Sequence, residues 1–193
     1  MRLPETVTTP RLILRRWLVD DAAVLSGAVA ESLDHLRPWM SWTADEPLST
    51  AARITVLEGF QTSWQAGTEV VYGAFLRPGS PGDGPGNTVV GGCGLVDRPE
   101  RATLEIGYWV HVDHLRRGFA TEMAAALTDA AFTLDAVEAV EIHHDRANRR
   151  SRAVPSRLGF RWAGERPDQV AAPAEEGIDC TWIMDRAYWV SRS

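Results

Sequence analysis

The sequence predicts a single α/β or α+β domain in which a mixed sheet is flanked by helices. Its 193 residues suit one domain, which we place over residues 1–193, and no internal repeat is visible. With 45% hydrophobic and 24% charged residues, the composition is ordinary for a globular protein. Strand-like and helix-like segments follow in the order strand, helices, several strands, helix, strand, helix and two strands. This order predicts a mixed sheet rather than an all-helical or all-strand fold.

The first third of the chain contains one predicted strand followed by helices. Residues 10–16 alternate apolar and polar side chains, as a half-buried strand does. Asp20 and Asp21 precede the apolar segment 22–30, and acidic side chains are favourable at the positive end of a helix. Residues 50–65 place apolar side chains at helical spacing and predict a second helix.

The middle of the chain is rich in residues that favour strands. Residues 69–76, 88–97 and 102–112 each carry runs of β-branched and aromatic side chains. The glycine- and proline-rich segment 77–87 separates the first two runs and predicts a long hairpin loop. We therefore expect three neighbouring strands here.

The last third returns to helix–strand alternation. From Gly118 onward, apolar residues recur at helical spacing as far as Leu134. Residues 137–143 form the next predicted strand. Asn148 then caps a helix that Gly159 ends. Two closing strands are predicted over 160–166 and 178–185.

Composition and missing motifs exclude several classes of chemistry. All 20 basic residues are arginine, so Schiff-base, Walker A and kinase lysine mechanisms are excluded. Cys93 and Cys180 form no CxxC, and the sequence has neither HExxH nor GxSxG, so we expect no metal site and no serine nucleophile elbow. The net charge of −6 argues against nucleic-acid and anionic-membrane binding. The absence of an apolar leader and the cysteine usage predict a reduced, cytoplasmic protein.

The most informative segment is the predicted strand–loop–helix joint around Gly118. Arg116 and Arg117 precede Gly118 where the helix opens directly after a strand. The first N–H groups of a helix lack internal partners, and the helix dipole makes that end positive. Gly118 and Ala120 leave the backbone accessible, so the joint predicts a pyrophosphate site. The alternative is an ordinary joint with solvated arginines.

Four segments together resemble one family. Residues 104–122, LEIGYWVHVDHLRRGFATE, resemble the acetyl-CoA motif of the GNAT superfamily of N-acetyltransferases, whose core is [QR]xxGx[GA]. Gly118 and Ala120 match that core, while Leu115 departs from its first position. The GFATE ending, with TPRLILRRW, HLRPWMSW and NRRSRAVPSRLGF, resembles the subgroup of RimJ/RimL-like ribosomal-protein N-terminal acetyltransferases. The resemblance covers about residues 8–188.

This resemblance implies a fold and a cofactor site. The family fold is a mixed, mostly antiparallel sheet that splays beside its fourth strand. The resemblance implies that strand backbone binds the pantetheine arm of acetyl-CoA, at Val110, His111 and Val112. It also implies that amides at a helix start cradle the pyrophosphate, at Arg116, Arg117, Gly118, Phe119, Ala120 and Thr121. The two arginine side chains would add charged contacts to phosphate.

The predicted helix after Asn148 would carry the remaining contacts. Asn148 serves as an N-cap, and the resemblance implies that it also meets the cofactor arm. Ser151 lies one turn later and is the candidate acid that protonates the leaving thiolate; a purely positioning role is the alternative. Pro155 stands where many relatives have the tyrosine acid, and it removes the helical bond to the Ser151 carbonyl. A kink or a local partner must offset that loss. One of Arg149, Arg150 and Arg152 would meet the 3′-phosphate, or all three form a solvated face.

The general base is the least determined group. Glu105 on the strand could take the amine proton directly or through water, or serve as a structural carboxylate. The resemblance also implies a carboxylate after the LGF segment, for which Asp168, Glu175 and Glu176 are candidates. Further alternatives by chemistry are His111, His114, His143 and His144.

The predicted activity is acetyl transfer from acetyl-CoA to a primary amine by direct attack, without a covalent enzyme intermediate. The acceptor is a protein N-terminus or a small-molecule amine, including an amino-sugar drug, and Trp39 and Trp42 either line its site or pack a helical flap. The competing class is a non-catalytic acyl-CoA-binding or regulatory module. The sequence is also compatible with a homodimer.

Overall fold

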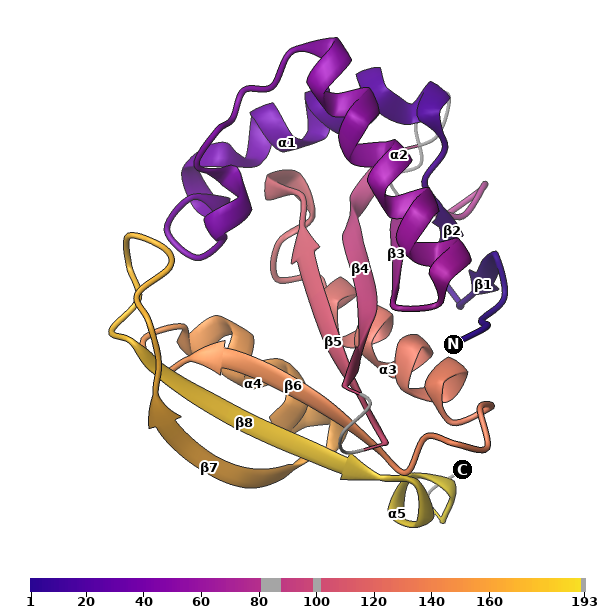
Figure 1. The fold of residues 1–193 in the computed structure, drawn as a ribbon, viewed down its shortest axis with the longest axis vertical. Helices are drawn as coiled ribbons and strands as arrows, with labels where there is room; N and C mark the ends of the chain where they lie inside the picture. The colour runs from indigo at the N-terminus through magenta and orange to yellow at the C-terminus, as the bar shows by residue number, and fades with distance from the viewer. Residues whose placement is uncertain (81–87, 99–101, 192–193) are drawn as a thin grey trace.

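The computed structural model describes residues 1–80, 88–98 and 102–191 (Figure 1). Within these residues the chain forms one 8-stranded sheet of order β1-β2-β3-β4-β5-β6-β8-β7. The strands are β1 Thr6–Thr8, β2 Leu12–Arg16, β3 Glu69–Leu76, β4 Val89–Arg98, β5 Thr103–Val110, β6 Ala139–Asp145, β7 Arg161–Pro167 and β8 Ile178–Asp185. The sequence predicted seven of them and missed β1. Residues 81–87 of the predicted hairpin loop lie outside the described residues.

The sheet is antiparallel except between β5 and β6, and these two strands separate along their length. Their parallel pairing runs from Thr103 to Ile106 on β5. Beyond that point β5 continues to Val110 and β6 to Asp145 without pairing, and Figure 1 shows them diverging. The splay therefore lies beside the predicted fourth strand, as the family resemblance implied.

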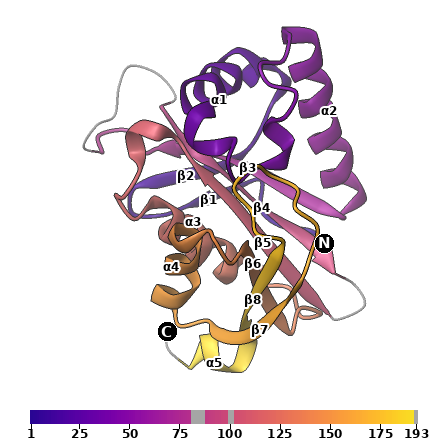
Figure 2. The same ribbon diagram turned by 90° about the vertical axis from the view of Figure 1, so that its left-hand side faces the viewer.

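Helices cover both faces of the sheet. Their bounds are α1 Ala22–Leu36, α2 Thr50–Ala66, α3 Phe119–Ala131, α4 Arg149–Leu158 and α5 Arg186–Val190, with short 3-10 turns at Val19–Asp21, Ser41–Thr43 and Val112–His114. One core joins α1 and α2 to the sheet, and a larger core joins α3 and α4 to the opposite face. Figure 2 shows that α1 and α2 lie on one side of the sheet and that α3 and α4 lie on the other.

Two helix boundaries and one terminal helix differ from the predictions. The first helix extends past residue 30 to Leu36, because Ser32 and Leu36 are still buried against the core. It ends shortly before Pro38, which has no N–H to continue the helical hydrogen bonding. The third helix ends at Ala131, so Leu134 packs from a turn instead. The short α5 was not predicted.

Candidate active site

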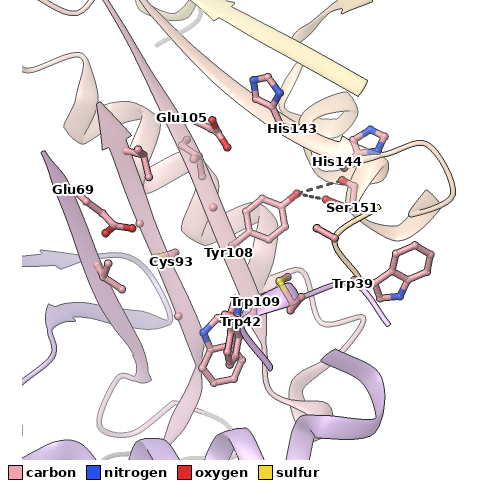
Figure 3. A pocket seen from close by; sticks show the side chains of 18 of the residues that line it. Trp39, Trp42, Glu69, Cys93, Glu105, Tyr108, Trp109, His143, His144 and Ser151 are labelled. Carbon is pink, nitrogen blue, oxygen red and sulfur yellow. Dashed lines mark hydrogen bonds between the residues drawn. The ribbon is translucent and has the colours of Figure 1, made fainter. Parts of the chain in front are cut away.

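A cavity of about 670 Å³ lies at the splay (Figure 3). Its floor is formed by β4 and β5, where Gly107 adds no side chain and a Cβ there would meet open space. The start of α4 and the segment after α1 form its walls. A volume of this size is typical of sites for small ligands or chain ends.

The first turn of α3 presents backbone N–H groups without helical partners. Gly118 caps this helix with φ +80°, a conformation that residues with side chains rarely adopt. The first helical bond runs from Glu122 N to Gly118 O at 3.0 Å. The amides that precede it belong to Phe119, Ala120 and Thr121. A Cβ on Gly118 would meet only Arg11, at 3.6 Å, so a ligand can approach this backbone.

A second cavity, of about 920 Å³, lies between the start of α3 and one side of α4. Its lining includes Arg11, Arg116, Arg149, Arg150 and Arg157. Five guanidinium groups beside an open helix start suit a polyphosphate. Of the three arginines considered on the predicted helix after Asn148, Arg149 and Arg150 line this cavity; Arg152 is not in its lining.

Arg11 is a member of this cluster that sequence analysis missed. It comes from the start of β2, more than 100 residues from α3. Its guanidinium lies 4.3 Å from the Phe119 ring centroid and pairs with Glu122 at 2.6 Å. The Thr9 hydroxyl and the guanidinium and N–H of Arg11 outweigh burial and lower the pKa of Glu122. This pairing ties the first strand to the anion site.

Of the two arginines predicted to contact phosphate, only Arg116 lines the cavity. Arg116, at φ +58°, lines the cavity. Arg117 instead contacts His114 Nδ1 at 3.1 Å and lies over the Phe119 ring at 5.3 Å. Phe119 itself is buried, so its side chain is not available to a ligand.

The predicted pantetheine-binding backbone already has several partners in this structure. His111 N donates to Val90 O at 2.7 Å within the sheet, and Val112 N donates to Ser32 Oγ at 3.1 Å. The Val110 carbonyl lies 2.8 Å from His35 Nε2. Because strand N–H groups alternate in direction, the Val110 N–H points away from β4 and toward the splay.

The start of α4 joins both cavities. Asn148 caps the helix through Oδ1, which accepts from Ser151 N at 3.1 Å. Asn148 and Ser151 line the cavity at the splay, while Arg149 and Arg150 of the same turn line the arginine cavity. The helix continues through Pro155, and a local partner meets the Ser151 carbonyl: the Tyr108 hydroxyl, at 3.3 Å.

Glu105 faces the cavity but is ion-paired. Its Oε2 accepts from Arg98 Nε at 3.0 Å and Nη2 at 2.6 Å. Glu69 occupies the same register two strands away, since both residues pair with Val96. It also lines the cavity, and burial raises its pKa. Sequence analysis missed Glu69, because nothing local marks which face its strand presents.

His143 lies between two carboxylates at the cavity wall. Its Nδ1 is 3.0 Å from Asp179 Oδ2, and its Nε2 is 3.1 Å from Glu141 Oε2. Burial disfavours the imidazolium, but the hydrogen bonds to these carboxylates outweigh it and raise the pKa of His143.

The other three candidate histidines are held in structural contacts. His144 accepts from Trp182 Nε1 at 3.0 Å, and burial lowers its pKa. Burial also lowers the pKa of His114, beside Arg117. His111 meets Glu31 at 3.0 Å, and its other nitrogen accepts from the backbone.

The carboxylates after the LGF segment separate into two groups. Asp168 and Glu175 line the cavity, although Glu175 Oε2 already accepts two backbone N–H groups. Glu176 pairs with Arg146 at 2.9 Å, and both side chains are half exposed. The loop that carries them contacts the turn after α1 through Ala174 N and Pro38 O, at 2.9 Å.

Two tryptophans stand at the mouth of the cavity. Trp39 and Trp42 line it, and Trp42 lies 6.3 Å from Trp109, centroid to centroid (Figure 3). Trp42 is 45% exposed, which is more than packing of a core flap requires.

A comparison with protein-family models matches residues 11–161 to the acetyltransferase (GNAT) domain. The chain belongs to the GNAT acetyltransferase family. It is therefore an acetyltransferase that uses acetyl-CoA as co-substrate, and the arginine cavity and open helix start fit that molecule. A search of curated proteins found no significant match.

Solved structures of similar fold include enzymes of the RimJ/RimL type. RimJ from Mycobacterium smegmatis, in complex with CoA-disulfide, is 21% identical, with a TM-score of 0.77 over 100% of this chain and 97% of that one. A putative ribosomal-protein-serine acetyltransferase from Vibrio cholerae is 20% identical, with a TM-score of 0.74 over 96% and 99% of the two chains. The microcin C7 self-immunity acetyltransferase MccE, in complex with acetyl-CoA and AMP, is 14% identical, with a TM-score of 0.80 over 92% and 93%.

In the part of the chain that the structure describes, no helix combines the length and apolar character needed to cross a bilayer.

Proposed function

We propose that this GNAT acetyltransferase acetylates the free α-amine of a peptide or protein N-terminus. The observation that carries the proposal is that one helical turn, the start of α4, borders both the arginine cavity and the cavity at the splay. Acetyl-CoA bound along the first would present its thioester to the second. Structural relatives that act on ribosomal proteins support a protein acceptor.

The acceptor cavity suits a cationic chain end. Glu69, Glu105 and Asp168 contribute carboxylates to its lining, while Trp42 and Trp109 offer apolar surface for a side chain. Acidic groups attract the ammonium form of an amine, which must then lose a proton before it can attack.

The proposed reaction divides the work among a few groups. Glu105 takes the amine proton through water, since Arg98 occupies only its Oε2. The Val110 N–H polarises the thioester carbonyl, and the amine nitrogen attacks that carbon. As the carbon–sulfur bond breaks, the Ser151 hydroxyl gives its proton to the thiolate and regains one from the attacking nitrogen, which becomes the neutral amide nitrogen. Arg116 and the amides of Gly118 to Thr121 hold the pyrophosphate.

A second acceptor class is a small primary amine that carries an aromatic ring, because the paired Trp42 and Trp109 rings would stack on such a group. The experiment separates the two classes by following free thiol released from acetyl-CoA. The acceptors are a serine-initiated hexapeptide, its N-acetylated form and phenethylamine. We expect release with the free peptide and none with the blocked one. Release with phenethylamine alone would assign a small-molecule acceptor, and CoA binding without release by any amine would support the non-catalytic module.

A further inference from the structure

Pro155 removes one hydrogen bond from α4, and a side chain from another element replaces it. In a regular helix the N–H of residue 155 would donate to the Ser151 carbonyl, and proline has no N–H. A half-buried carbonyl without a partner is unfavourable. The Tyr108 hydroxyl, 3.3 Å from Ser151 O, supplies the missing donor.

The same hydroxyl also meets the side chain of Ser151. Tyr108 OH and Ser151 Oγ are 3.0 Å apart, so the phenol hydrogen lies within reach of both oxygens of one residue (Figure 3). Tyr108 lies two residues beyond Ile106, the last residue of β5 that pairs with β6, and its ring packs against the larger core. The splay is what lets a β5 side chain reach α4.

We propose that Tyr108 is a positioning residue for acetyl transfer: its single hydroxyl hydrogen is shared between the Ser151 carbonyl and Ser151 Oγ in a three-centre bond. That shared hydrogen stands in for the helical bond lost at Pro155 and leaves the Ser151 hydroxyl hydrogen to point toward the CoA sulfur. When Tyr108 donates to Ser151 Oγ, the serine hydrogen is left for another acceptor. The same bond stabilises charge that develops on Oγ as the thiolate takes the serine proton. Burial raises the pKa of Tyr108 to about 12, so the phenol stays a donor at neutral pH. This inference rests on the proposed role of Ser151.

A set of variants separates positioning from simple support of the helix. The variants are Tyr108→Phe, Ser151→Ala, Pro155→Ala and the doubles Tyr108→Phe/Ser151→Ala and Tyr108→Phe/Pro155→Ala. Pro155→Ala restores an N–H that can donate to the Ser151 carbonyl without replacing the contact to Oγ. Turnover is measured by thiol release with the serine-initiated hexapeptide and with phenethylamine, and stability by thermal unfolding.

We expect Tyr108→Phe to lower kcat roughly tenfold or more while KM for acetyl-CoA changes less than about threefold. Adding Pro155→Ala should recover the lost melting temperature but not kcat. Tyr108→Phe should cost little further kcat in the Ser151→Ala background, because both act through one hydroxyl.

Three results would overturn the inference while Ser151→Ala remains slow: unchanged kcat in Tyr108→Phe, recovery of kcat by Pro155→Ala, or fully additive losses in the double variant. Unchanged kcat in Ser151→Ala would instead refute the proposed role of Ser151, and the inference with it. Absence of thiol release by the wild-type protein with both acceptors would contradict the proposed function itself.

Discussion

At the residue scale, His143 links stability to pH. Its pKa is raised from 6.5 by the carboxylates of Asp179 and Glu141 despite burial. A raised pKa in the folded state stabilises the protein fully below the unfolded value, and that contribution is lost as pH rises through the folded value. The ion pairs around His143 therefore weaken on the alkaline side of 6.5.

We expect His143→Gln to flatten this pH dependence. The free energy of unfolding of the wild-type protein, measured by urea denaturation from about pH 6 to pH 9, should fall relative to that of the variant as pH rises. The difference between the two proteins removes the contributions of other groups. A constant difference across the range would show that His143 does not carry the linkage.

The proposed base gives a second prediction at this scale. Glu105→Gln should lower kcat at neutral pH, and raising the pH should recover activity because more of the amine is already neutral. Glu69→Gln is the matched variant, because Glu69 faces the same cavity from the same register.

The pH–rate profiles of both variants, measured with the serine-initiated hexapeptide, check this assignment. A Glu105→Gln profile identical to the wild type, together with a depressed Glu69→Gln profile, would move the base to Glu69.

At the scale of elements, the link between α1 and α2 depends on a buried ion pair. Glu46 and Arg53 meet at 2.5 Å, with side chains 3% and 4% exposed. Arg53 Nε also donates to Ser26 Oγ at 3.1 Å, which joins the link to α1. The segment that presents Trp42 to the cavity is thereby fixed.

Glu46→Ala should destabilise the protein by about 3–5 kcal/mol, because it leaves the Arg53 guanidinium buried without its carboxylate. The comparison is Glu5→Ala, which removes an exposed carboxylate that pairs with the partly buried Arg16 at 3.3 Å and should cost at most about 1 kcal/mol. Urea denaturation measures both. Equal small losses would mean that the buried pair does not hold this link.

Elements with local signals were predictable. The Asn148 cap, Gly159 at the helix end and the strand over 69–76 are all found where the sequence indicated. The departures have tertiary causes: β1 is three residues long and exists through its pairing with β2.

Site residues follow the same division. Arg116 and Ser151 come from local motifs, and the structure places both in cavity linings. Arg11, Glu69 and Tyr108 enter through contacts between distant strands and helices, and no periodicity in the sequence reports which way a strand faces. Pro155 indicates from the sequence alone that the Ser151 carbonyl lacks its helical hydrogen bond. Only the structure shows that the Tyr108 hydroxyl donates to that carbonyl instead.

At the scale of the whole molecule, the first turn of α4 borders both cavities, the one beside the start of α3 and the one lined by Trp39 and Trp42. The cavity at the splay exists because β5 and β6 separate after Ile106. We propose that acetyl-CoA spans the two cavities and that the backbone amides following Gly118 hold its pyrophosphate.

Calorimetric titration of CoA into Gly118→Val tests this claim most directly, with Gly79→Val as the matched control. Both glycines have φ +80° and room for a Cβ in the structure, so both variants carry similar backbone strain, about 1–2 kcal/mol. We predict wild-type affinity for Gly79→Val and a loss of roughly a hundredfold or more for Gly118→Val, because the added side chain keeps phosphate from the helix amides. Wild-type CoA affinity in a folded Gly118→Val protein would contradict the account.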